Sequence, residues 1–247
     1  MNELYEKDIK CDLYMLSGAG KPRLSRISEV LLVAATEHMD MWGWEHGRLE
    51  QDYNVCLVIV GLRLELNGVL RLGESLHLKT WTGKRKFPIM QRFFTIANAS
   101  GETVCEAVMQ TVLMNIRTRT LVSDIQGLSL NAPPEPPEIS VKRLSCGKLR
   151  LTDTAAELPE HSGSIKAEFS DLDYNGHVNT ARYVDFIENL LGLSWFNEHC
   201  VRTLEVHYNR ELMYGELCEI RAYEDNGELK FFGAVGGEER FDALVIV

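Results

Sequence analysis

An internal repeat is the feature that most constrains how this chain can fold. Residues 62–81 (LRLELNGVLRLGESLHLKTW) align without gaps on residues 204–223 (LEVHYNRELMYGELCEIRAY), at an offset of 142 positions. Apolar and polar residues alternate in both copies, which is typical of half-buried strands, and Gly73 falls on Gly215. Two unrelated strand pairs could alternate alike, but a helical pattern precedes each copy in the same order, so we favour a tandem repeat.

Each predicted helix has the apolar spacing of a helix with one buried face. The first pattern covers residues 25–38 and the second covers residues 179–192. We expect Ser25 and Asn179 to be the N-caps, and Gly192 to end the second helix in a left-handed conformation. Strand-like runs follow each helix, so each unit is predicted to be one long helix wrapped by a curved antiparallel sheet, an α+β arrangement.

A proline-rich stretch separates the two units. Four of the seven prolines lie within residues 131–138, which favours a stiff, extended connector. We therefore expect an N-terminal unit at residues 1–130, a connector at residues 131–150 and a C-terminal unit at residues 151–247.

Composition and charge exclude several classes of protein. The chain has 26 Lys and Arg and 36 Asp and Glu residues, and the net charge of −10 argues against nucleic-acid binding. No apolar run reaches the length of about 18 residues that suggests a membrane span, and residues 1–15 lack the apolar centre of a signal peptide. We therefore expect a cytoplasmic protein without stable membrane insertion. The six cysteines form no C-x-x-C pair and no metal-ligand spacing occurs, so no metal site is expected.

The two units differ in the residues that precede their helices. The second unit has D-x-N-x-H-x-N at residues 173–179, whereas residues 17–24 before the first helix contain no carboxylate, amide or imidazole. In the aligned strands, Val69 of the first unit corresponds to Glu211 of the second. A turn followed by a helix cap is the alternative explanation for the polar motif. Because both differences occur in the same unit, we favour a single reactive site there.

At these residues the sequence resembles the acyl-[acyl-carrier-protein] thioesterases. The family hallmark S-D-L-D-x-N-x-H-V-N-N-x-x-Y is similar to residues 170–183, and L-x-Y-R-R-E-C is similar to residues 206–212. Residues 34–38 and 112–115 resemble two further family motifs, so the resemblance covers nearly the whole chain. It implies a double hot-dog fold, in which two long helices are each cradled by a curved sheet. The family's cysteine is Leu212 here, which excludes a thiol nucleophile at that position.

The resemblance implies hydrolysis of fatty acyl thioesters on acyl carrier protein, which releases free fatty acid and holo-ACP and terminates fatty acid synthesis. It implies no cofactor. Either Glu211 or Asp173 would be the general base, with His177 orienting that carboxylate or protonating the leaving thiolate, and Asn175 positioning water or carbonyl. Direct attack by water and a transient acyl-carboxylate anhydride both remain open. An acyl-CoA thioesterase, a hydratase of the same fold and a non-catalytic acyl-binding protein are the alternative functions.

The family places the acyl chain in the first unit, in an elongated apolar pocket. Core packing is the alternative explanation for every apolar candidate, because Met and Trp fill cores in all proteins. The candidate substrate-binding residues are Asn179, Met39, Met41, Trp44, Met109 and Met114.

The implied partner is acyl carrier protein with a 4'-phosphopantetheine-linked fatty acyl chain. Because that protein is strongly acidic and this chain is acidic too, docking requires a local basic patch. Lys84, Arg85 and Lys86, with Arg92 nearby, cluster around one predicted hairpin, and Arg182 lies on the second helix. A solvated charged surface is the alternative. A monomer and a homodimer are both compatible with the sequence.

Overall fold

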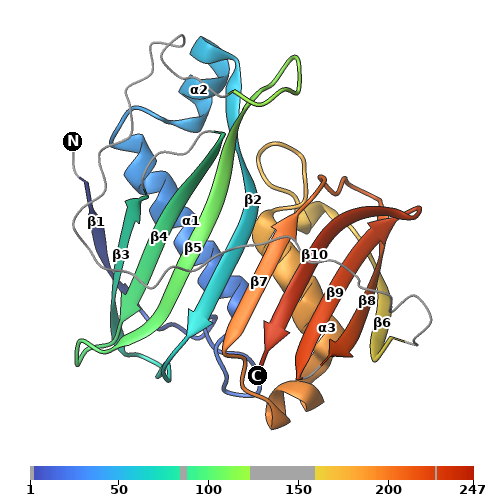
Figure 1. Cartoon of the computed structure of the whole chain (residues 1–247). Coiled ribbons are helices and arrows are strands. Elements are labelled where there is room, and N and C mark those ends of the chain that lie inside the picture. The colour runs from blue at the N-terminus through green and yellow to red at the C-terminus, as the bar shows by residue number, and fades with distance from the viewer. Residues whose placement is uncertain (1–2, 84–87, 123–158, 226) are drawn as a thin grey trace.

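One antiparallel sheet backed by two long helices organises the protein. The computed structural model describes residues 3–83, 88–122, 159–225 and 227–247, and within these residues ten strands form a single sheet. Helices α1 (Leu24–Asp40) and α3 (Thr180–Glu198) lie against the same face of that sheet (Figure 1). The predicted connector, residues 131–150, and the boundaries at residues 130 and 151 lie outside the described residues.

Apart from one short helix in the first half and one 3-10 turn in the second, the two halves of the chain contain the same elements in the same order. In the first half, β1 (Tyr5–Lys10) and α1 are followed by a short helix, α2 (His46–Tyr53), and by β2 (Val55–Leu66), β3 (Ser75–Thr82), β4 (Ile89–Ala97) and β5 (Thr103–Asn115). In the second half, β6 (His161–Lys166), a 3-10 turn (Phe169–Asp171) and α3 are followed by β7 (Thr203–Tyr208), β8 (Leu217–Asp225), β9 (Glu228–Val235) and β10 (Glu238–Ile246).

The sheet is symmetric about its centre, which confirms the predicted repeat. The strand order is β1-β3-β4-β5-β2-β7-β10-β9-β8-β6, so equivalent strands occupy equivalent places on either side of the β2–β7 pair. Within that pair Arg63 lies directly opposite Glu205, its own counterpart at the offset of 142 positions. An ion pair of 2.8 Å joins their side chains at the junction.

The first half is longer than the second at one end of the sheet. Strand β2 has 12 residues and β5 has 13, whereas their counterparts β7 and β10 have 6 and 9. Helix α2 lies at the extended end (Figure 1), and Asn54 ends it in a left-handed conformation with φ of 55°. A small separate core fills the extension, formed by Trp42, Trp44, Leu49, Val55 and Leu113.

The main core lies between the sheet and the two long helices. Apolar side chains from both halves form one continuous cluster, including Ile27 and Leu31 of α1 and Phe186 and Ile187 of α3. Full burial of each such side chain stabilises the fold by about 1.5–3 kcal/mol. Among the described residues, no helix is long and apolar enough to cross a membrane.

Of the three predicted helix ends, Asn179 was right, Ser25 was wrong, and Gly192 marks a break inside α3 instead of its end, because α3 continues to Glu198. Asn179 caps α3 by accepting a hydrogen bond from the Ala181 amide at 2.9 Å, and Gly192 interrupts α3 at φ of 75°. Ser25 is not an N-cap, because α1 begins at Leu24 and Ser25 is buried within its first turn. Glu188 of α3 instead accepts a 2.7 Å hydrogen bond from the Leu24 amide, so one long helix caps the other.

Candidate active site

Both long helices are preceded by turns with the same backbone hydrogen bonds. We call residues 16–22 the N-terminal turn and residues 172–178 the motif turn. The amide of Ser17 donates to the carbonyl of Lys21 at 2.8 Å, and the amide of Asp173 donates to the carbonyl of His177 at the same distance. The isolated bridge that closes each turn joins its first and last residues, and the glycine at the fifth position of each turn, Gly20 or Gly176, has φ of 68° or 79°.

The match between the turns shows that the backbone does not require the polar motif. Ser17, Ala19 and Lys21 in the N-terminal turn stand where the motif turn has Asp173, Asn175 and His177. Turn formation alone therefore does not explain those three residues, which weakens the structural alternative for the motif.

Asp173 does contribute to the local structure of its turn. Its Oδ1 atom accepts hydrogen bonds from the amides of Asn175 at 2.8 Å and His177 at 3.3 Å. In the N-terminal turn, the Ser17 hydroxyl is buried without a hydrogen-bond partner among the described residues. The aspartate thus holds the motif turn more firmly than serine holds its counterpart. Asn175 is exposed and His177 is partly exposed, so both can be reached by a ligand.

The loop between β7 and β8 brings Glu211 next to the motif turn. The Val178 amide donates to the carbonyl of Leu212 at 2.9 Å, and His177 forms an isolated β-bridge with Met213. The Leu212 amide in turn donates to the Tyr183 hydroxyl of α3 at 2.9 Å. Leu212 itself is fully buried, which fits a packing role at the position of the family's cysteine.

Glu211 forms a two-point ion pair with an arginine of the first half. Nη2 of Arg119 lies 2.7 Å from Oε1 and 2.5 Å from Oε2 of Glu211, and this pairing raises the pKa of Arg119. Arg119 follows β5 and has φ of 58°, a left-handed conformation that is uncommon for a residue with a side chain. Sequence reasoning missed Arg119, because the two residues are 92 positions apart and no local pattern links them.

The four predicted catalytic residues occupy two adjoining loops, the motif turn and the loop between β7 and β8. We call these two segments the reactive loops. Within the described part of the chain, no hydrogen bond joins the side chains of Asp173, Asn175, His177 and Glu211 to one another. The Glu211 side chain keeps about a quarter of its surface exposed, at 26%. The site therefore offers a carboxylate held by a cation, an imidazole and an amide beside solvent, the groups needed for general acid–base chemistry.

A cavity of about 90 Å³ lies in the extended part of the first half. It is bounded by α1, by Trp42 and Trp44 and by strands β2 to β5. Of the predicted substrate-binding residues, Met39, Trp44 and Met109 line it. The other candidates lie elsewhere: Met41 is 51% exposed, Met114 is not among the lining residues, and Asn179 caps α3.

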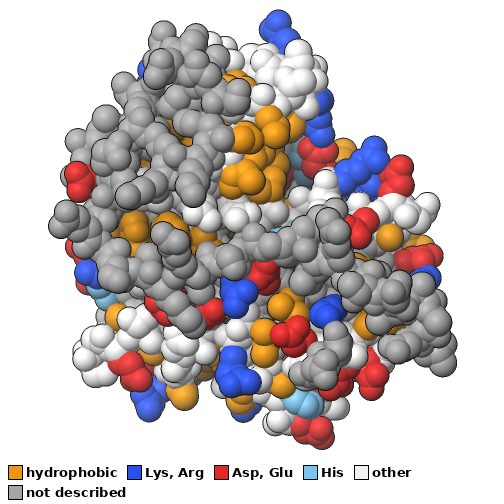
Figure 2. Space-filling view, in the orientation of Figure 1, with side chains coloured by type: hydrophobic (Ala, Val, Ile, Leu, Met, Phe, Trp, Pro, Cys, Tyr) orange, Lys and Arg blue, Asp and Glu red, His pale blue; other side chains and the backbone are white. Residues whose placement is uncertain are grey.

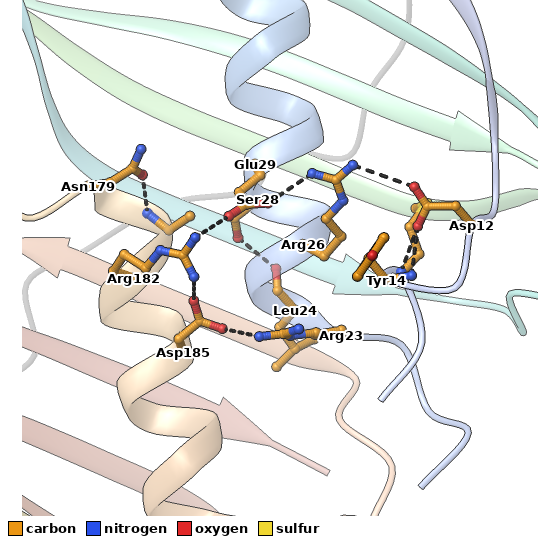
Figure 3. Close-up of polar contacts among 12 residues, drawn as sticks. Asp12, Tyr14, Arg23, Leu24, Arg26, Ser28, Glu29, Asn179, Arg182 and Asp185 are labelled. Carbon is orange, nitrogen blue, oxygen red and sulfur yellow. Dashed lines mark hydrogen bonds and ion pairs between the residues drawn. The ribbon is translucent and has the colours of Figure 1, made fainter. Parts of the chain in front are cut away.

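Arg182, predicted to face the carrier protein, lies in an ion-pair network between the two helices (Figure 3). Its guanidinium contacts Asp185 at 2.6 Å and Glu29 of α1 at 3.3 Å, and Arg23 contacts Asp185 at 2.8 Å. The pair Arg26–Glu29 in α1 repeats the spacing of Arg182–Asp185 in α3. The charge of Arg182 is thus already balanced by carboxylates.

The remaining predicted carrier-facing residues, Lys84, Arg85 and Lys86, lie outside the described residues. Basic and acidic side chains are interspersed over the coloured part of the face in Figure 2. Arg92, assigned to the same basic hairpin, is 5% exposed and lines the cavity. That part of the patch prediction was wrong, because Arg92 points to the helix side of the sheet, where it contacts His38 of α1.

The chain matches two family models over most of its length. One, described as acyl-ACP thioesterase N-terminal domain, matches residues 2–126, and the other, the acyl-ACP thioesterase C-terminal domain, matches residues 156–235. A chloroplastic dodecanoyl-[acyl-carrier-protein] hydrolase of Umbellularia californica is 28% identical over 144 residues. That match covers 56% of this chain, and the chain spans only 37% of the relative's length.

Solved structures have the same fold over the whole chain. An acyl-ACP thioesterase from Bacteroides thetaiotaomicron is 21% identical with a TM-score of 0.79, covering 99% of this chain and 97% of that one. A 12:0-ACP thioesterase from Umbellularia californica is 17% identical with a TM-score of 0.81, covering 100% of this chain and 97% of that one.

Proposed function

Because this chain belongs to the acyl-ACP thioesterase family, we propose that it hydrolyses fatty acyl thioesters carried on acyl carrier protein. The products are free fatty acid and holo-ACP, and the reaction ends chain elongation in the cytoplasm. The observation that carries this proposal is the one-sided chemistry of two equivalent turns, since only the motif turn has Asp173, Asn175 and His177. We further propose that the two helix-backed halves form a double hot-dog fold.

Glu211 is the proposed general base. A water molecule attacks the thioester carbonyl carbon while the Glu211 carboxylate takes its proton. The carbon–sulfur bond then breaks, and the departing thiolate takes a proton from His177. Asn175 orients the carbonyl group or the water through its side-chain amide, and Asp173 holds the turn on which both residues lie. With Leu212 in place of cysteine, the protein needs no thiol for this reaction.

Arg119 is the proposed positioning residue for Glu211. Nη2 of Arg119 contacts both carboxylate oxygens of Glu211, so the ion pair restricts the orientation of that carboxylate. Since Arg119 comes from the first half, it also couples the reactive loops to the half that contains the cavity.

The cavity is the proposed acyl-chain site. Leu57 and Ile59 of β2 line it. The neighbouring Cys56 is near enough to Arg119 and Glu211 for both charges to affect its pKa. An acyl chain can therefore run from the reactive loops along the start of β2 and beneath β5. The volume of about 90 Å³ is smaller than the roughly 150 Å³ of an engineered cavity that binds benzene, so long chains require the lining methionines to move.

A thiol-release assay with carrier-bound acyl chains of several lengths tests the proposal. We expect release of free thiol at a rate that depends on chain length. A higher kcat/KM for acyl-CoA would favour a coenzyme A thioesterase, and binding of acyl chains without thiol release would contradict hydrolysis. Sedimentation of the same preparation would separate a monomer from a homodimer; packing of α1 on α3 within one chain makes a monomer sufficient.

A further inference from the structure

Arg92 is a buried cation with an unusual set of partners. It is 5% exposed, and its Nη1 atom donates hydrogen bonds to Nδ1 of His38 at 2.9 Å and to the Thr80 hydroxyl at 3.3 Å. Its Cζ atom lies 5.1 Å from the centre of the Trp42 ring, within the range of a cation–π interaction. Each of these groups is a neutral acceptor or an aromatic face.

Among the described residues, no carboxylate contacts Arg92. Arg240 of β10, which is 6% exposed, shows the usual arrangement, since it is paired with Glu216 at 2.9 Å and Glu238 at 3.2 Å. An isolated buried charge is destabilising by several kcal/mol unless an opposite charge compensates it, so a cation of this kind calls for an explanation. Burial lowers the pKa of Arg92 to about 9, which leaves it protonated at neutral pH.

Arg92 lies on the side of the cavity that faces away from β7 and the second half. The cavity extends under β2, β5, β4 and β3, and this is also their order outward from β7 and the second half. Leu57 and Ile59 line it on β2, whereas Arg92 lies on β4 and contacts Thr80 on β3. The walls between them are mainly apolar, so a chain that enters past β2 meets a guanidinium at the far end.

We infer that the Arg92 end of the cavity binds an oxygen acceptor, above all a carboxylate, at the end of an aliphatic chain. The inference rests on the proposed function only in assigning the cavity to acyl chains. A carboxylate there supplies the charge that Arg92 lacks, and Nη2 and Nε are not occupied by the hydrogen bonds to His38 and Thr80. Two sources share this chemistry: a carrier-bound acyl chain oxidised at its far end, and a free fatty acid that enters carboxylate first.

The first test measures binding without any turnover. Trp42 and Trp44 line the cavity, so their fluorescence reports occupancy. We expect the wild-type protein to bind decanoate at least about tenfold more tightly than methyl decanoate, because only the former offers an anion. R92M should remove that preference, and R92K should keep part of it. Equal binding of the two ligands by the wild type, or an unchanged preference in R92M, would overturn the inference.

A second variant guards against failure of R92M to fold. Met109 is the direct cross-strand partner of Arg92, so M109E places a carboxylate opposite the guanidinium without altering it. We expect M109E to lose the preference for decanoate, while M109Q, which has a similar size and no charge, keeps it. Loss of the preference in both variants, or in neither, would contradict a charge effect.

The second test identifies the source of the carboxylate. Thiol release is compared for carrier-bound decanoyl chains that end in a methyl group or in a carboxyl group. Faster release from the carboxylated chain in wild type but not in R92M supports an oxidised acyl substrate. Decanoate binding without that effect supports free fatty acid as the ligand. If decanoate binds through Arg92 and neither thioester is cleaved, the proposed function fails and the site remains; if neither test shows a role for Arg92, the inference fails.

Discussion

The N-terminal turn and the motif turn have the same backbone and different side chains. Both precede a long helix, both close with the same pair of hydrogen bonds, and both place a glycine at positive φ. One has serine, alanine and lysine where the other has aspartate, asparagine and histidine. The comparison shows that this backbone turn forms with either set of side chains, so the structural role and the proposed catalytic role of the motif residues can be tested separately.

A second difference between the halves concerns length. The cavity is lined by Leu57, Ile59 and Thr111, and these residues lie in the parts of β2 and β5 that extend beyond the strands β7 and β10. Aromatic side chains pack closely in the second half. The ring centres of Tyr183 and Phe241 are 5.3 Å apart. Phe241 also lies directly over Gly233, where the Cβ of any other residue would clash with its ring. The extended copy thus contains the cavity that we propose for the acyl chain, and the other copy contains the proposed catalytic residues.

Exchanging the turns should produce the largest effect. The triple variant D173S/N175A/H177K gives the motif turn the side chains of the N-terminal turn. We expect kcat/KM for acyl-ACP to fall by about 10³-fold or more, because the groups act as a unit. The melting temperature should change by only a few degrees. Unfolding of the variant would show that the polar residues are required by the turn itself.

Glu211 and Val69 allow the same exchange on the aligned strands. We expect E211V to lower kcat by about a hundredfold, since the general base is removed. The reciprocal V69E should leave the rate unchanged, because Val69 is 65% exposed and has no motif turn beside it. Steady-state kinetics with one acyl-ACP substrate measure both. A rate for E211V close to that of the wild type would assign the base to Asp173 or to another group.

Arg119 can be removed without disturbing its backbone. Glycine readily adopts the φ of 58° found there, so R119G deletes the guanidinium and relieves the conformational cost. We expect kcat to fall by about tenfold, because the Glu211 carboxylate loses the group that orients it. Added guanidinium ion should restore part of the rate.

The neighbouring Arg117 is the matched control for Arg119. It is exposed in the same turn, and no ion pair involving it is found among the described residues. R117Q should therefore retain the wild-type rate. A fall in R117Q equal to that in R119G would point to carrier docking by the whole turn instead of positioning of Glu211.

The repeat made much of the fold predictable from the sequence. Alternation and the aligned glycines fixed the strands after each helix, and Gly73 and Gly215 do have nearly equal φ of 80° and 81°. The extension and α2 were not predictable, because they lie outside the aligned stretches and α2 exposes most of its surface. The pairing of β2 with β7 was also unpredictable, since either half could have ended in a free edge.

The site was predictable only where chemistry and local sequence coincide. Asp173, Asn175 and His177 are separated by single residues, so they could be recognised together. The pairing of Glu211 with Arg119 could be identified only from the three-dimensional structure, because 92 positions separate the two residues. The burial of Arg92 did have a signal: it shares the strand alternation of Phe94 and Ile96, both buried, but the neighbouring lysines and arginine suggested a surface cluster.

The extension can be tested by filling its cavity. I59F adds volume on the β2 side of the cavity. We expect kcat/KM to fall by severalfold to about tenfold for long acyl chains and much less for short ones, because each methylene excluded from an apolar pocket loses about 1–3 kcal/mol. Overpacking should also lower stability by about 1–3 kcal/mol. The same relative loss at every chain length would place the acyl chain elsewhere.

The smallest expected effect concerns the ion-pair network between the helices, where the two halves are most alike. R182Q removes the contacts to Asp185 and Glu29, but Arg23 still neutralises Asp185 and Arg26 still neutralises Glu29. Because Arg182 is about one-third exposed, at 34%, we expect a loss of only about 0.5 kcal/mol. R26Q, the equivalent change in α1, should lower the melting temperature by a similar small amount. Neither variant should alter KM for acyl-ACP, since these charges are already paired within the molecule. A raised KM in R182Q alone would mean that the carrier protein competes for Arg182, and would break the equivalence of the two helices at this point.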